Sequence, residues 1–206
     1  MNIQIVDKMG SDLTVVNSAR VSFNKHKQEF GDNDEKLIAY LAKHNHWSPF
    51  SHCSLQFRIK APIFVARQLV KHQVGLAWNE VSRRYVDDKP EFYIPFLWRE
   101  RAENKKQGSA ESEVEYDITD FVKSAKSLYS DMLESNIAPE MARMVLPQNM
   151  MTEWYWSGSL YAFTRVCNLR NKDDSQEETR MITQPMAKHL KDHFPISAKY
   201  LLDEEI

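Results

Sequence analysis

The chain has only two cysteines, Cys53 and Cys167, among its 206 residues. Two cysteines exclude a disulfide framework and are too few to complete a thiolate metal site. No apolar run approaches membrane-spanning length, and the first ten residues lack the charged-then-apolar pattern of a secretion signal. We therefore expect a cytoplasmic protein without membrane association, in which both cysteines are reduced and serve packing.

An excess of charge of one sign is also missing, since 27 basic residues nearly balance 29 acidic ones and the formal net charge is −2. A global basic field, which drives binding to nucleic acid, is therefore absent. The positive charge is local, and it suits a small phosphorylated ligand better than a polymer. Because 42% of the side chains are hydrophobic and no composition break divides the chain, residues 1–206 are expected to form one catalytic domain.

Hydrophobic periodicity predicts a mixture of strands and helices. Strands are predicted at residues 2–6 and 51–60. Helices are predicted at 32–44, 61–72, 117–133, 139–147, about 154–170, and from Gln176 onward with a kink at Pro185. Residues about 99–116 are charged without apolar periodicity, which predicts an exposed loop that carries no chemistry. The fold class that follows is α+β, with a small central sheet surrounded by helices.

The most polar cluster lies at residues 67–85, where basic side chains, a histidine, a carboxylate, amides and a serine share a short stretch. Helical spacing places Gln68 and His72 on one face of a helix. After Gly75 the period changes to two, which predicts a strand at 79–85. One side of this strand carries Glu80, Ser82 and Arg84. Any one of these residues alone is explained by a helix with a solvated basic face, followed by an edge strand with ordinary surface charge. The whole cluster together favours a site for an anionic ligand.

This cluster resembles the signature R-H-R-x-x-S-x-N-E-x-S-x-R of flavin-dependent thymidylate synthases. Lys71-His72-Gln73 stands at the R-H-R, and the NEVSRR run at 79–84 matches the second half fully. Lysine and glutamine replace the two arginines, and the spacing from His72 to Asn79 is one residue longer. Further segments are similar to the family in the same order, at 19–23, 44–52, 60–68, 91–95, 141–147 and 167–170.

The resemblance implies a methyltransferase that converts dUMP to dTMP. Methylenetetrahydrofolate would supply the carbon, FADH2 the hydride, and NADPH would reduce the flavin. It also implies a homotetramer in which subunits share active sites. The residues implied to bind dUMP are Gln68, Lys71, Glu80, Ser82, Arg84, Arg143 and Arg170. The residues implied to bind FAD are Ser48, Lys71, His72, Gln73, Asn79, Glu80, Ser159, Tyr161 and Arg165.

Arg170 is the expected catalytic residue, because it matches the arginine that faces uracil and favours its ionised form electrostatically. Arg143 is expected to reach the phosphate from a neighbouring subunit, where a guanidinium can pair with it in bidentate fashion.

Three alternatives remain beside this interpretation. A metal site at His44, His46 and His52 is disfavoured because no carboxylate lies within residues 44–52, and we predict no metal. A nucleotide- or flavin-binding homologue without synthase activity would explain the altered R-H-R. A nucleic-acid-binding module would use the basic helix and the aromatic residues at 152–163, but the net charge argues against it.

Overall fold

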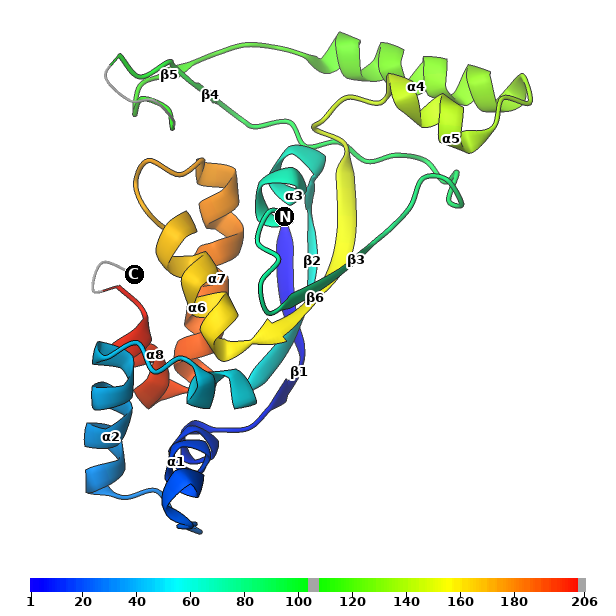
Figure 1. Ribbon diagram of the computed structural model, residues 1–206. Helices are drawn as coiled ribbons and strands as arrows, with labels where there is room; N and C mark the ends of the chain where they lie inside the picture. The colour runs from blue at the N-terminus through cyan, green and yellow to red at the C-terminus, as the bar shows by residue number, and fades with distance from the viewer. Residues whose placement is uncertain (104–107, 204–206) are drawn as a thin grey trace.

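The computed structural model describes residues 1–103 and 108–203 (Figure 1). Its main sheet has four antiparallel strands in the order β1-β2-β6-β3. Their bounds are β1 Asn2–Met9, β2 Ser54–Pro62, β6 Met151–Ser159 and β3 Leu76–Glu80. The register of β2 and β6 places Phe57 opposite Trp156, so the centre of the sheet joins distant parts of the sequence.

Helices surround this sheet, which confirms the predicted α+β fold. Their bounds are α1 Asp12–Arg20, α2 Asp32–Lys43, α3 Ile63–Leu69, α4 Thr119–Glu134, α5 Pro139–Ala142, α6 Leu160–Arg170, α7 Glu177–His193 and α8 Pro195–Leu201, with short 3-10 helices η1 Val21–Phe23, η2 Ser48–His52 and η3 Arg143–Val145. Figure 1 shows α4 and α5 at one end of the molecule, and α1, α2 and α8 at the other. In the part of the chain that the structure describes, no helix is both long and apolar enough to cross a membrane.

The core lies on one face of the sheet, where side chains alternate with period two. Trp154 and Trp156 on β6 are buried, whereas Tyr155 between them is 44% exposed. Trp78 on β3 stacks on Trp154 with ring centroids 4.4 Å apart. The prediction of a helix from about Trp154 was therefore wrong up to Ser159. Aromatic residues fit a pleated surface well, and the pairing of β6 with β2 and β3 decides the conformation.

Two other predicted boundaries need correction. The helix predicted at 61–72 ends at Leu69, although a hydrogen bond from the His72 amide to the Leu69 carbonyl (3.0 Å) continues the turn. The strand predicted at 79–85 ends at Glu80. Beyond it, the Tyr85 amide donates to the Ser82 carbonyl at 3.0 Å, which closes a turn. The alternation predicted along 79–85 therefore stops after its second residue.

The charged segment at 99–116 belongs to a hairpin of two short strands, β4 Trp98–Arg99 and β5 Glu113–Val114. The Glu100 amide donates to the Ser112 carbonyl at 2.9 Å, and the Trp98 indole N–H donates to the Tyr116 carbonyl at 2.6 Å. Residues 104–107 of the predicted loop lie outside the described residues.

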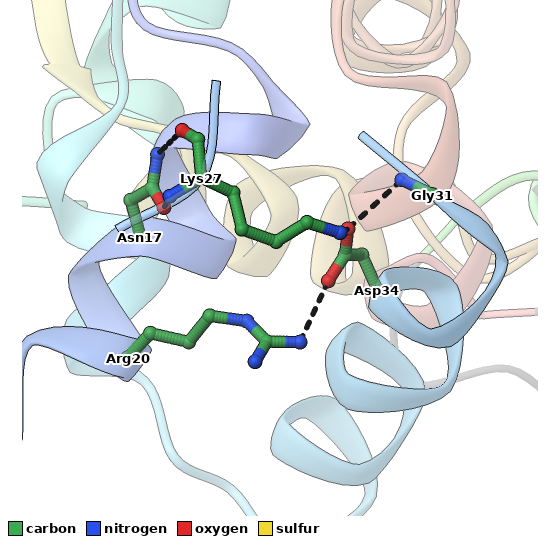
Figure 2. Close-up of polar contacts among 5 residues, drawn as sticks. All are labelled: Asn17, Arg20, Lys27, Gly31 and Asp34. Atoms are coloured by element: carbon green, nitrogen blue, oxygen red, sulfur yellow. Dashed lines mark hydrogen bonds and ion pairs between the residues drawn. The ribbon is translucent and has the colours of Figure 1, made fainter. Parts of the chain in front are cut away.

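A buried carboxylate joins α1 to α2 (Figure 2). The Asp34 side chain has no exposed surface and accepts hydrogen bonds from Arg20 Nη2 (2.8 Å), from the Gly31 amide (2.8 Å) and from Lys27 Nζ. The Asn17 side chain in turn holds the backbone of Lys27 through two hydrogen bonds, at 2.9 and 3.0 Å. Burial alone would raise the pKa of Asp34, but the hydrogen bonds from Lys27, Gly31 and Arg20 outweigh it and lower that pKa.

A second acidic side chain ties the first helix to the eighth. Asp12, at the start of α1, accepts hydrogen bonds from the Ile196 amide (3.0 Å) and the Ser197 amide (2.9 Å) in the first turn of α8. The Ser197 hydroxyl also donates to it. Asp12 therefore caps a helix that lies 184 residues later in the chain.

Both cysteines are buried free thiols, in agreement with a packing role. Burial raises the pKa of Cys53 to about 11, and burial also raises the pKa of Cys167. A thiol with a raised pKa is a poor nucleophile at neutral pH, because only the thiolate attacks.

Candidate active site

The predicted cluster comes together around Arg170, at the C-terminus of α6. Its Nε donates a hydrogen bond to Nε2 of His72 at 3.0 Å, and its Nη2 donates to the backbone carbonyl of Gln68 at 3.2 Å. Gln68 lies in the last turn of α3 and His72 just beyond the end of this helix. Of the polar cluster at 67–85, the Gln68 backbone and the His72 ring therefore contact the CNLR segment at 167–170.

Burial and the repulsion between neighbouring positive charges decide which of His72 and Arg170 carries a charge. Burial lowers the pKa of His72, and the positive charges of Arg170 and Arg165 lower it further. Nε2 of His72 accepts a hydrogen bond, so the neutral imidazole carries its proton on Nδ1, as assigned from this bond. Burial also lowers the pKa of Arg170, yet a guanidinium stays charged at any physiological pH. Arg170 is therefore the cation, and His72 orients it.

The Gln68 side chain is held by the first turn of α7. Its Nε2 donates to the side-chain oxygen of Gln176, and its Oε1 accepts from the Thr179 hydroxyl at 3.2 Å. Sequence reasoning missed Gln176 and Thr179, because polar residues at the start of an amphipathic helix carry no sign of their distant partner. Gln68 and Arg170 line a hollow of about 470 Å³, to which Gln176 also contributes.

Lys71, His72, Gln73 and Arg165 line a second hollow, of about 430 Å³. Arg165 also borders a smaller hollow of about 250 Å³. In that smaller hollow the rings of Trp47 and Tyr161 lie 6.4 Å apart. Cations beside aromatic rings fit a cofactor that combines phosphates with planar rings, such as FAD.

Two further residues predicted to contact flavin lie near these hollows. Ser159 caps α6, since its hydroxyl accepts a hydrogen bond from the Ala162 amide at 3.2 Å, and Ala162 lines the second hollow. Ser48 is exposed at the start of η2, directly after Trp47. Each of these serines thus neighbours a residue that lines one of the hollows, Ala162 for Ser159 and Trp47 for Ser48.

Glu80 and Arg143 line a third hollow, of about 270 Å³, together with Lys60. Glu80 accepts hydrogen bonds from the Thr152 hydroxyl (2.7 Å) and the Trp78 indole (3.1 Å), which fix its carboxylate on the sheet. Thr152, which sequence reasoning missed, is buried on β6.

The remaining predicted residues are Ser82, which is half-buried, and Arg84 and Asn79, which are exposed. In the turn after β3, Arg84 Nε donates to the Ser82 hydroxyl at 3.2 Å, and the Arg84 guanidinium lies 5.1 Å from the ring centre of Tyr85. Asn79 is exposed on β3. Among the described residues of one chain, the structure therefore leaves Ser82 and Arg84 apart from Arg170.

The histidines at 44–52 show no metal-binding arrangement. His44 and His46 pack against Tyr40, with ring centroids 4.3 and 5.9 Å away. Across residues 1–103 and 108–203, no group of three or more His, Cys, Asp or Glu side chains is placed to hold a metal ion.

Comparison with known proteins finds relatives that are similar to nearly the whole of this chain. Residues 4–196 match the family described as "Thymidylate synthase complementing protein". A flavin-dependent thymidylate synthase of Thermus thermophilus is 37% identical over 199 residues, which cover 95% of this chain and 73% of that protein. The enzyme of the same name from Thermosipho africanus is 36% identical over 200 residues, covering 94% of this chain and 87% of that protein.

A solved structure shows the same fold. The UMP/dUMP methylase PolB from Streptomyces cacaoi, bound with 5-Br dUMP, superposes with a TM-score of 0.86 at 29% sequence identity, covering 97% of this chain and 93% of that chain. The same methylase bound with 5-Br UMP gives a TM-score of 0.81. Sequence and structure thus agree over nearly the whole chain.

Proposed function

This chain belongs to the flavin-dependent thymidylate synthase family, and we propose that it catalyses the reductive methylation of dUMP to dTMP in the cytoplasm. The carbon comes from methylenetetrahydrofolate, and NADPH reduces the flavin. Nucleotides closely related to dUMP are bound by the similar methylase PolB. The protein itself must bind a dianionic nucleotide, hold its uracil ring in position and stabilise the negative charge that develops on that ring.

The arrangement of Arg170 is the observation that carries this proposal. A guanidinium held in place by a neutral imidazole and a backbone carbonyl is oriented before the substrate arrives. Such a preorganised cation stabilises charge as it forms on the pyrimidine, without a reorganisation cost during the reaction. Arg170 therefore acts electrostatically on the uracil edge. His72 positions it, and Gln68 lies beside it at the substrate.

The flavin would bind beside Arg165, in the second hollow and in the smaller hollow of about 250 Å³. Lys71, His72, Gln73 and Arg165 are the cationic and polar groups of this surface. Further contacts are proposed for Ser48, Asn79, Glu80, Ser159 and Tyr161. The reduced flavin supplies the hydride when it is bound.

The phosphate is bound where two subunits meet. In one chain Arg84 and Ser82 lie in the turn after β3, while Arg143 lines the third hollow beside Glu80. A homotetramer in which Arg143 reaches a neighbour's nucleotide would bring these groups together. Apolar side chains on the helices near Arg143 support such an interface, since Phe121 on α4 is 60% exposed and Met144 on η3 is 71% exposed.

Product analysis tests this function. The purified protein is incubated with dUMP, methylenetetrahydrofolate, NADPH and FAD, and dTMP is measured by mass spectrometry, with each component omitted in turn. UMP replaces dUMP in a parallel reaction. Formation of dTMP only when all components are present supports the proposal. Binding of FAD and dUMP without any methylated product would instead identify a homologue without synthase activity, and binding that weakens steeply with salt would indicate a polymer ligand.

A further inference from the structure

The β4–β5 hairpin is fixed to the start of α7 by one arginine. Arg99 Nη2 donates to both carboxylate oxygens of Glu178, at 2.6 and 2.8 Å, and Arg99 Nη1 lies 3.1 Å from a Glu177 oxygen. Arg99 Nε donates to the Ser109 hydroxyl on the returning arm, at 2.8 Å. All three guanidinium nitrogens therefore contact protein groups.

The burial of Glu178 means that breaking its ion pair with Arg99 would destabilise the fold. Its side chain is only 5% exposed. Burial alone would raise the pKa of Glu178, but the hydrogen bonds and the charge of Arg99 lower it. A carboxylate that is buried without its partner destabilises the fold far more than an exposed ion pair stabilises it. The pair is therefore maintained whenever this part of the protein is folded.

A second contact fixes the other arm of the hairpin. Gly108 has a φ of +85°, which L side chains rarely adopt. A Cβ added there would lie 3.1 Å from the carbonyl oxygen of Asp174 in the segment before α7. The backbone of Gly108 therefore packs closely against the backbone of Asp174, in the segment that precedes α7.

The hairpin and Arg170 face the same hollow of about 470 Å³. Gly108 and Ser109 line it from the hairpin, Ser175 and Gln176 from the segment before α7, and Gln68 and Arg170 from α3 and α6. Arg99 and Asp174 line the hollow as well, but Arg99 is already paired with Glu177 and Glu178. The rest of the lining consists of hydroxyls, amides and the Arg170 guanidinium, and it suits an uncharged base and sugar better than a phosphate.

We propose that the described residues of the β4–β5 hairpin form a wall of the pocket for the pyrimidine nucleoside part of the substrate, and that Arg99 is a positioning residue for it. This inference rests on the proposed function. Glu178, which Arg99 holds, is flanked closely in the same helical turn by Gln176 and Thr179, and these two residues hold the Gln68 side chain. Loss of Arg99 therefore loosens the hairpin wall and the support of Gln68 together.

Nucleotide affinity of the full-length protein tests the role of Arg99. Arg99→Gln and Glu178→Gln should each weaken dUMP binding, measured by calorimetry, by roughly tenfold or more. The double variant should bind no more weakly than the worse single variant, because the two residues act as one pair. Arg99→Lys should restore part of the affinity, since it keeps the charge but loses the bidentate contact. In steady state, KM for dUMP should rise more than kcat falls.

Arg20→Gln is the matched control, because Arg20 also pairs with a buried carboxylate (Figure 2) but belongs to α1, at the opposite end of the molecule from the β4–β5 hairpin (Figure 1). It should lower the unfolding midpoint without changing dUMP affinity. If Arg99→Gln does not fold, Gly108→Ala tests the same wall, since it leaves the ion pair in place but strains the approach to Asp174. It should also weaken dUMP binding.

The outcomes separate this inference from the proposed function. If the unmutated protein binds dUMP and folded Arg99→Gln or Gly108→Ala binds it within about twofold, the hairpin is not part of the pocket. If Arg20→Gln and Arg99→Gln lose dUMP affinity to the same extent, Arg99 contributes only to the stability of the fold and not to the pocket. If the unmutated protein does not bind dUMP, the proposed function fails, and the inference fails with it.

Discussion

Arg170 Nε and His72 Nε2 lie 3.0 Å apart, so two residues separated by 98 positions form one hydrogen-bonded pair. His72 also lines the hollow that holds Lys71 and Arg165, whereas Arg170 lines the hollow that holds Gln68. The pair therefore stands at the boundary between the proposed flavin region and the proposed nucleoside pocket.

Replacing Arg170 with alanine should lower the rate of dTMP formation by about 10²–10³-fold, because a preorganised charged donor is lost from the transition state. Single-turnover methylation measures this effect directly. Flavin absorbance and circular dichroism should stay close to those of the unmutated protein. Arg180→Ala, which removes an ion pair with the exposed Asp173, is the control and should retain the rate. Near-normal methylation by Arg170→Ala would remove Arg170 from its role.

His72 should make folding stability sensitive to mild acid. Because its pKa is lowered in the folded protein, the unfolded chain takes up a proton at a pH where the folded protein does not. Stability should therefore fall as the pH drops below about 6.5, the ordinary histidine value, towards the lower pKa of the folded state. Urea midpoints across this range should decline less in His72→Gln, which keeps an acceptor for Arg170. An equal decline in both proteins would contradict the assignment.

The double variant Cys53→Ser, Cys167→Ser should keep its kcat. Both sulfurs are buried, and serine can donate to the carbonyl groups that these thiols contact, Ser11 at 3.4 Å and Thr183 at 3.7 Å. The thermal midpoint should fall somewhat, because serine is more polar and smaller. Complete inactivation of a folded, flavin-loaded double variant would instead support covalent catalysis by a cysteine.

Subunits that carry Arg84→Ala or Arg143→Ala should each be inactive alone, yet active when mixed. If Arg84 serves its own site and Arg143 a neighbour's, random mixing leaves about a quarter of the sites with neither mutation. Activity after co-expression, compared with each parent, measures this rescue, and size-exclusion chromatography confirms that mixed oligomers form. Mixed oligomers without activity above the parents would refute the shared site, as would a fully active monomer.

Asp34→Asn should destabilise the fold by about 3 kcal/mol, because it leaves two cations without their buried counterion. The value is at the low end for buried pairs, since the Arg20 and Lys27 side chains are 26% and 35% exposed and can reach water. Chemical denaturation measures the loss, and Asp32→Asn, an exposed change in the same turn, should cost much less. Because the pKa of Asp34 is lowered, its contribution is present above about pH 4 and is lost as the pH falls further.

Local patterns were sufficient to predict much of the fold. The strand at β2 and the helices α2 and α4 follow from period-two and helical spacing of apolar residues, and these features survive in the structure. β6 was missed because its aromatic run joins directly onto α6 at Leu160, so periodicity over a long window averages a strand with a helix. The pairing that forces residues 151–159 to be extended lies about one hundred positions away.

For the candidate site, the sequence predicted the residues that meet at Arg170 better than the residues that hold their side chains in place. Gln68, His72 and Arg170 were named from motif positions, and the structure brings them together. Gln176 and Thr179, which hold Gln68, were not found, because their role depends on a tertiary contact between α3 and α7. Arg99 lies in the charged segment that is predicted to be an exposed loop. In a sequence, an arginine that pairs with a distant buried carboxylate cannot be distinguished from a solvated surface arginine.

The cap that Asp12 places on α8 has a consequence for the order of folding. The first helix contacts amides that are synthesised 184 residues later, so α1 cannot reach its final contacts until α8 has been synthesised. The strands β1 and β2 likewise wait for β6 to complete the centre of the sheet. Contacts of such long range slow the search for the native state and leave apolar surface exposed for longer. Nascent chains are therefore expected to need protection from aggregation until α8 has emerged.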